Sequence, residues 1–165
     1  MKTIRPPAVA GLFYPADADE LRTQIDALLR QASAPATPTP KAVIVPHAGY
    51  VYSGAVAASA YAALRSLHDQ VTRVVLLGPA HRVAFRGLAA STADAFHTPL
   101  GDVPVDHATL ARLRELPQVR MIDQAHALEH SLEVQLPFLQ MTLKSFTLMP
   151  LVVGDATYAE TAEVL

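Results

Sequence analysis

Hydrophobic residues along the chain follow two different spacings. Residues 17–31 place Leu and Ile at the period of one helix face, and Asp17 with Glu20 three residues later is typical of a helix start. By contrast, short continuous apolar runs are typical of strands that a parallel sheet buries on both faces. Three such runs occur, at 41–46, 73–78 and 145–153.

The remaining pattern predicts an alternation of strands and helices. A helix over 53–67, capped by Ser53, would join the first two strands into a right-handed βαβ unit. The other expected elements are strands at 87–92 and 119–123, extended pieces within 96–105, a short helix capped by Asp106, a helix over 126–141 bent at Pro137, a final helix from Thr157, and a proline-rich loop at 33–40. We therefore expect an α/β fold with a mostly parallel or mixed sheet flanked by helices, in a single domain over residues 1–165.

Composition narrows the class of function. The chain has 165 residues, 51% of them hydrophobic, which is enough for a sizeable core. Its net charge is -2 with scattered cations, so neither nucleic acid nor a membrane surface is expected as a partner. Because the chain contains no cysteine, disulfides and thiolate ligands are excluded within it. The first residues lack the apolar segment of a signal peptide, and we expect a cytoplasmic protein.

Two histidines follow predicted strands directly. His47 comes after the apolar run 41–46, and His81 comes after 73–78. The carboxyl ends of parallel strands form the edge where such sheets bind ligands, and neighbouring strands lie about 5 Å apart. Two imidazoles there could bind one metal ion such as zinc, iron or copper. The alternative is that each histidine only forms hydrogen bonds in its turn.

A second motif lies at residues 126–130. His126, Glu129 and His130 match the H-x-x-E-H pattern, so a zinc hydrolase with Glu129 as base is one hypothesis. The alternative is a solvated polar helix face opposite a leucine stripe. In an intermediate interpretation, His130 and Glu133 line the same cleft as the two strand-end histidines.

Tyrosines near His47 are candidate pocket residues. Tyr50 and Tyr52 could position a substrate, or they could pack against the edge of the sheet. Ser53 is interpreted as a helix cap, because the chain lacks the G-x-S-x-G motif of serine hydrolases. Glycine-rich nucleotide motifs are absent as well. The other histidines are interpreted as surface or capping residues: His68, His97 and His107.

Several segments, taken together and in order, resemble the MEMO family, called AmmeMemoRadiSam system protein B in bacteria. They are RPPAVAGLFYP (5–15), PHAGYVYSG (46–54), GPAH (78–81), FHTPLGD (96–102), EHSLEVQLPFL (129–139) and MPLVVG (149–154). The resemblance implies a three-layer fold similar to the LigB-type class III extradiol dioxygenases. It also implies a cleft in which two histidines, here His47 and His81, bind iron or copper. The histidine of the EHS segment, His130, would lie in or near that cleft as a catalytic residue.

The resemblance also carries expectations about partners and completeness. Bacterial members are associated with a radical-SAM partner, and binding of signalling peptides is attributed to the eukaryotic branch. Members normally continue past the point where this chain ends, and their later part supplies an Asp-x-x-His segment and a cysteine ligand. We therefore expect an incomplete metal site, in a chain that is either truncated at its C-terminus or a degenerate member of the family. An exposed sheet edge in such a chain would favour oligomers.

Three functional hypotheses remain open, and so does the question whether the chain is an enzyme. The first is metal-dependent oxidoreductase or dioxygenase-like chemistry at His47 and His81, with Tyr50, Tyr52, Glu129 and Glu133 lining the cleft. The second is a non-catalytic module that binds a peptide or a small molecule in the same cleft. The third is the zinc hydrolase at residues 126–130.

Overall fold

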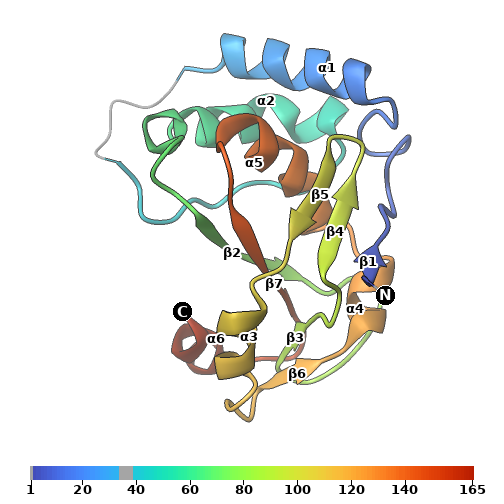
Figure 1. Ribbon diagram of the computed structural model, residues 1–165, viewed down its shortest axis with the longest axis vertical. Coiled ribbons are helices and arrows are strands. Elements are labelled where there is room, and N and C mark those ends of the chain that lie inside the picture. Colours follow the sequence, from blue (N-terminus) through green and yellow to red (C-terminus); the bar gives the residue numbers. More distant parts are fainter. Residues whose placement is uncertain (1, 34–38) are drawn as a thin grey trace.

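The fold is α/β, with mixed sheets flanked by helices, in a computed structural model that describes residues 2–33 and 39–165 (Figure 1). One sheet has the strand order β2-β7-β3-β6 and the other β1-β4-β5. The bounds of the strands are β1 Ile4–Arg5, β2 Arg73–Pro79, β3 Leu88–Ala90, β4 Ala95–Thr98, β5 Gly101–Pro104, β6 Val119–Met121 and β7 Thr147–Val153.

Helices occupy both ends of the molecule. Figure 1 shows α1, α2 and α5 together at one end, β2 and β7 across the middle, and α3, α4 and α6 at the other end. Their bounds are α1 Ala18–Gln31, α2 Tyr50–Ala62, α3 His107–Leu113, α4 Asp123–Ala127, α5 Leu136–Thr142 and α6 Tyr158–Val164, with 3-10 turns η1 Arg65–Leu67 and η2 Glu133–Gln135. No helix in the described part of the chain is long and apolar enough to cross a membrane.

Strand β7 is the centre of the larger sheet. It pairs in parallel with β2 along seven residues, from Arg73 opposite Thr147 to Pro79 opposite Val153. Its other neighbour, β3, runs antiparallel to it, and β6 is parallel to β3. The five residues from Leu148 to Val152 are all buried, which is why an unbroken apolar run predicted this strand.

Helices α1 and α2 pack closely against each other because one residue of α2 is glycine. A Cβ atom on Gly54 of α2 would lie 2.9 Å from Leu28 Cδ1 of α1. Leu21 and Ile25 of α1 are fully buried, as the helical spacing predicts. The capping predictions at Asp17, Asp106 and Thr157 are confirmed, because each side chain accepts a backbone N–H of its own first turn.

Two predicted elements are wrong. Residues 41–46 form no strand, and Ile44 is 101% exposed. The expected βαβ unit is therefore absent from the described residues. The helix predicted over 126–141 is interrupted, since α4 ends at Ala127 and regular helix resumes only at Leu136. The proline-rich loop at 33–40 lies largely outside the described residues.

The start of α2 also differs from the prediction. The helix begins at Tyr50, with Gly49 as its N-cap residue. Ser53 therefore lies inside the first turn, and its hydroxyl donates to Ala48 O at 2.9 Å. Serine inside a helix commonly bonds back to an earlier carbonyl in this way, so the cap predicted at Ser53 is wrong.

A buried ion pair joins the N-terminal segment to the segment after α4. Arg5 donates to Glu133, and its guanidinium also donates to the carbonyls of His126 and Glu129, at 2.7 to 3.0 Å. Glu133 is fully buried, and it also accepts from Ala8 N, Val9 N and Tyr14 Oη at 2.6 to 3.0 Å. Each charge thus has several hydrogen bonds, which offset the cost of removing it from water.

His126 belongs to this core and not to the polar helix face. It is 2% exposed, its Nε2 lies 3.0 Å from Ala89 O, and Phe96 contacts its ring edge-on. The zinc-site hypothesis required His126 and His130 on one face of one helix. That geometry is wrong, because α4 ends between the two residues.

Replacement of Glu133 by Gln should strongly destabilise the fold. The change leaves the Arg5 guanidinium buried without its counter-charge, which costs about 3 to 5 kcal/mol in free energy of unfolding. Urea unfolding of the parent and the variant measures this difference. Asp26→Asn is the matched control, since Asp26 pairs with Arg30 at the surface and should contribute less than about 1 kcal/mol. Equal effects of the two changes would contradict the role given to the buried pair.

His126 should make stability depend on pH between 7 and 5. Burial lowers its pKa to about 4, despite the hydrogen bond to Ala89 O. The unfolded chain, with an ordinary histidine pKa near 6.5, therefore takes up the proton first, and stability is lost as the pH falls from 6.5 towards 4. Between pH 7 and 5, the parent should lose about 2 kcal/mol more than His126→Gln. An equal loss of free energy of unfolding between pH 7 and 5 in the parent and in His126→Gln, measured by urea unfolding, would refute this.

Candidate metal centre

His47 is held at the start of α2 by contacts on both sides of it. Gln135 Nε2 donates to Pro46 O at 3.1 Å, and the amide of Tyr50 donates to Phe13 O at 2.7 Å. These bonds fix the turn between the extended residues 41–46 and α2 without a paired strand before it. The imidazole of His47 is half-buried.

His81 follows β2, as the sequence predicts, and its position depends on the end of that strand. Ala80 N donates to Val153 O of β7 at 2.9 Å, so the sheet pairing continues to the residue before His81. A Cβ on Gly78 would lie 2.7 Å from Ser131 Oγ and 2.8 Å from Leu132 Cδ2. The glycine therefore lets the segment after α4 approach β2 closely.

His130 comes from that segment, between α4 and η2. Ser131 Oγ donates to Pro79 O at 3.0 Å and ties the segment to the end of β2. The His130 ring then stacks on the His81 ring, with 4.6 Å between their centroids. The ring of Phe13 also contacts that of His130, with 4.8 Å between their centroids.

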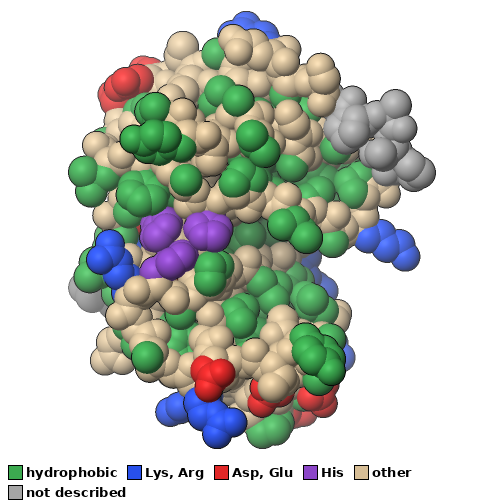
Figure 2. Space-filling view, turned by 180° about the vertical axis from the view of Figure 1, so that it is seen from behind, with side chains coloured by type: hydrophobic (Ala, Val, Ile, Leu, Met, Phe, Trp, Pro, Cys, Tyr) green, Lys and Arg blue, Asp and Glu red, His purple; other side chains and the backbone are tan. Residues whose placement is uncertain are grey.

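The three imidazoles form one cluster. The centroid of the His47 ring lies 5.3 Å from that of His81 and 5.9 Å from that of His130. One ring nitrogen from each residue can be chosen so that all three lie within 4.8 Å of one another. Figure 2 shows the three side chains side by side at the molecular surface. They therefore reach one another from three separate segments.

Glu129 is the hydrogen-bond acceptor at the base of this cluster. Its carboxylate accepts from His81 Nδ1 at 2.8 Å and from the amide of His81 at 2.6 Å. It also accepts from the amides of His130 and Ser131, both at 2.9 Å. Burial alone would raise the pKa of this carboxyl group, but these hydrogen bonds outweigh burial and lower it to about 2.

The hydrogen bond from His81 fixes which nitrogen is free. Ionised Glu129 requires the proton of the His81 ring on Nδ1, so the lone pair of Nε2 is left for a ligand. Burial lowers the pKa of His47 and of His130, and the neighbouring imidazoles lower both further. Both rings therefore favour the neutral form, which is the form that binds metals.

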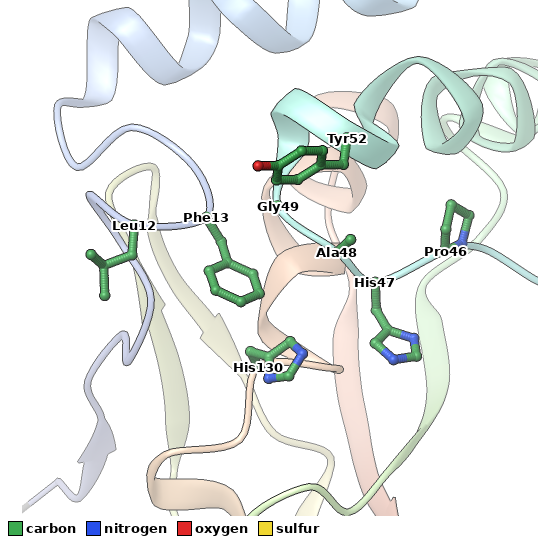
Figure 3. Close-up of a pocket in the computed structure, with 8 residues that line it drawn as sticks. All are labelled: Leu12, Phe13, Pro46, His47, Ala48, Gly49, Tyr52 and His130. Atoms are coloured by element: carbon green, nitrogen blue, oxygen red, sulfur yellow. The ribbon is translucent and has the colours of Figure 1, made fainter.

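An apolar pocket adjoins the cluster. Its volume is about 610 Å³, and it is lined by Leu12, Phe13, Pro46, His47, Ala48, Gly49, Tyr52 and His130. Figure 3 shows the His47 and His130 rings on the same side of the pocket, with Phe13 beside His130 and Tyr52 at the opposite margin. None of the described residues that line it is an acidic residue, a lysine or an arginine, and the two histidines provide its side-chain nitrogens.

The structure separates the other predicted site residues. Tyr52 lines the pocket, and Glu129 contacts two of the histidines. Tyr50 is instead buried behind the turn, with its hydroxyl donating to Val134 O at 2.8 Å, and burial raises its pKa. Glu133 lies in the core with Arg5 and does not reach the cleft.

Sequence reasoning missed two pocket residues near the N-terminus. Leu12 and Phe13 lie in a turn that Glu133 holds through the amides of Ala8 and Val9 and the hydroxyl of Tyr14. The segment RPPAVAGLFYP contributed to the family resemblance, but its spacing indicated no role. Arg5 is a charged residue in an otherwise apolar segment, and this was the feature of the sequence that could have indicated a specific role for the segment.

The tri-histidine cluster fits a transition-metal ion as it stands. Imidazole nitrogens suit zinc, iron and copper, and three protein ligands with an open position are typical of catalytic metal sites. One of the three is fixed by an outer carboxylate, as metal-binding histidines commonly are. The sequence predicted only His47 and His81 as ligands, and the fold adds His130 to the cluster.

Comparison with known proteins identifies a family whose members resemble nearly the whole chain. The sequence profile of the family described as "Memo-like protein" matches residues 5–165. A "MEMO1 family protein" of Aquifex aeolicus is 40% identical over 156 residues, which are 94% of this chain and 57% of the relative. "Protein MEMO1" of Xenopus tropicalis is 38% identical in an alignment of 160 positions that covers 93% of this chain and 52% of the relative. This chain thus spans about half the length of the curated relatives it matches.

A profile match over nearly the whole chain shows common ancestry, and relatives from a bacterium and a vertebrate agree with it at about 40% identity. The chain belongs to the Memo-like protein family.

Proposed function

We propose that this chain binds a divalent transition-metal ion through His47, His81 and His130. The observation that carries the proposal is the convergence of three ring nitrogens within 4.8 Å of one another, from segments far apart in the sequence. A chance group of surface histidines would not share a buried carboxylate that fixes one tautomer. Glu129 does so here, through hydrogen bonds to one ring and to three amides.

We propose iron or copper as the metal, for oxidoreductase or dioxygenase-like chemistry. The ligand set alone also suits zinc, and the preference for a redox-active ion rests on the family resemblance. Such an ion would supply one-electron chemistry and polarise a bound oxygen or carbonyl group. The chain's own residues would hold the ion, fix the His81 tautomer and, through Leu12 and Phe13, limit water on the pocket side.

His130 is better placed as a ligand than as a separate catalytic acid or base. Its ring stacks on His81, and its nitrogen belongs to the same cluster as the other two. The site expected from the sequence was incomplete, because only His47 and His81 were predicted as metal ligands. With His130 the chain offers three ligands without a cysteine. On the family resemblance, we also propose for this chain the activity of a whole family protein and an interaction with a radical-SAM partner.

The first test is metal content. Anaerobically reconstituted protein should bind Fe(II) or Cu(II) stoichiometrically, and His47→Ala should weaken binding by more than about tenfold, because it removes one of three ligands. Elemental analysis and titration calorimetry measure this. The matched control is His97→Ala, since His97 is an exposed histidine that pairs with Asp102 at 2.7 Å outside the cluster.

The two variants also separate the competing hypotheses. Loss of metal in both would indicate non-specific binding by surface imidazoles. A folded parent that takes up neither ion, nor Zn(II), would overturn the metal proposal and favour the non-catalytic module. Stoichiometric zinc with no uptake of iron or copper would keep the site but reject the redox chemistry.

Glu129→Gln should lower metal affinity without removing a ligand. The amide can no longer hold His81 as a carboxylate does, and loss of such an outer partner typically costs about 10- to 100-fold in affinity. Calorimetric titration with Zn(II) avoids oxidation during the measurement. Asp102→Asn serves as the matched control, because Asp102 is also a carboxylate that accepts from a histidine ring, His97 Nδ1 at 2.7 Å, but lies outside the cluster. Unchanged affinity in Glu129→Gln would show that Glu129 does not orient His81.

A further inference from the structure

Tyrosine is the side chain of this protein that most readily loses a single electron. The sequence contains five tyrosines but neither tryptophan nor cysteine, the other two types that are oxidised in this way. Iron and copper centres carry out one-electron chemistry. Because such an ion changes by one electron at a time, the reduction of an oxidant that takes up two electrons requires a second donor. A tyrosine near the metal site is therefore a candidate for that donor.

Three of the tyrosines form one buried aromatic group together with Phe138. The ring centroids of Tyr14 and Tyr50 lie 5.5 Å apart. The ring of Phe138 lies between those of Tyr50 and Tyr61, with centroid distances of 4.9 and 5.0 Å. Each of the three tyrosines is at most 5% exposed. An unpaired electron on one of these rings would therefore be shielded from solvent.

The acceptors of the three hydroxyl groups distinguish Tyr14 from the other two. Tyr50 and Tyr61 each donate to an amide-type carbonyl oxygen at 2.8 Å. Tyr14 Oη donates to a carboxylate oxygen, Glu133 Oε1, at 2.6 Å. A phenol that loses an electron becomes a strong acid, and a carboxylate within hydrogen-bond distance can accept its proton. Oxidation is therefore favoured at Tyr14 over the other two tyrosines.

Tyr14 is connected to the histidine cluster through the residue before it. Figure 3 shows Phe13 beside His130, and the centroids of these two rings lie 4.8 Å apart. The carbonyl of Phe13 also accepts from Tyr50 N at 2.7 Å, which ties this turn to the aromatic group. An electron can thus pass from Tyr14 to an ion at the cluster across covalent bonds and one contact between rings.

We propose that Tyr14 donates one electron during the reaction of the metal centre with a peroxide, and that Glu133 accepts its proton. The inference rests on the proposed function, because it requires a redox-active ion at His47, His81 and His130. With Fe(II) and hydrogen peroxide, the iron and Tyr14 supply one electron each. The O–O bond of the peroxide breaks, and two protons from solvent complete two water molecules. The other products are Fe(III), a neutral Tyr14 radical and protonated Glu133.

The surroundings of Tyr14 suit this step. Burial and the adjacent carboxylate raise the pKa of Tyr14, so the phenol is protonated and donates its hydrogen bond before the reaction. Glu133 also accepts from Arg5 and from the amides of Ala8 and Val9, which hold the carboxyl group in place when it takes up the proton. When the radical is reduced again, the proton can return along the same hydrogen bond.

The test is electron paramagnetic resonance of protein that has been reconstituted anaerobically with Fe(II), assayed for iron, and frozen after mixing with hydrogen peroxide. The parent should show a tyrosyl radical, and Tyr14→Phe should lose it. Tyr61→Phe is the matched control and should keep the signal, because it removes a buried hydroxyl of the same aromatic group that has no carboxylate acceptor. Protein loaded with Zn(II), which has no redox chemistry, should give no signal.

A second measurement retains the hydroxyl group and does not depend on the folding of Tyr14→Phe. Fluorotyrosine incorporated in place of Tyr14 should add fluorine hyperfine splitting to the radical signal. The same amino acid in place of Tyr61 should leave the signal unsplit.

The outcomes separate this inference from the metal site itself. Bound iron without a tyrosyl signal would overturn the inference alone. So would a signal that persists in Tyr14→Phe, or one that fluorotyrosine in place of Tyr14 does not split. A folded parent that binds no iron would overturn the inference together with iron as the proposed metal.

Discussion

The buried pair of Arg5 and Glu133 is the interaction on which the rest of the site depends. It connects the first strand to the segment after α4, and each partner also holds backbone groups of the other's segment. Through Glu133 it positions the turn that carries Leu12 and Phe13. Through Arg5 it holds the carbonyls of His126 and Glu129, just before His130. Burying two charges is costly, and this cost is met here by hydrogen bonds that also order the cleft.

Glu129 performs a similar task closer to the surface. Four donors surround its carboxylate, and they keep it ionised although it is buried. An ionised acceptor beneath His81 selects one tautomer, and the amide of His130 shares the same oxygen as the His81 ring. The relative positions of these two histidines are thus set by one carboxylate. Such an arrangement is pre-organised, because little rearrangement is needed to offer nitrogens to a metal ion.

Apolar side chains adjoin the histidine cluster, because both line the same pocket. The histidine cluster is polar and small, whereas the pocket beside it is apolar and the nearby helix α2 exposes Val51 and Val56. A metal centre in proteins commonly works in a shielded cavity. Residues 41–46 illustrate this, because exposed apolar side chains there come shortly before His47.

The sequence by itself determined most of the elements and the membership of the family. Strand β7, helix α1 and the caps at Asp106 and Thr157 follow from local periodicity and side chains, which act within a few residues. His47 and His81 could be proposed as partners because both follow apolar runs. Only the tertiary structure decided that residues 41–46 stay unpaired, that His126 is buried, and that His130 joins the cluster. These outcomes depend on contacts between distant segments, such as Ser131 with Pro79 and Glu129 with His81, and no local spacing encodes them.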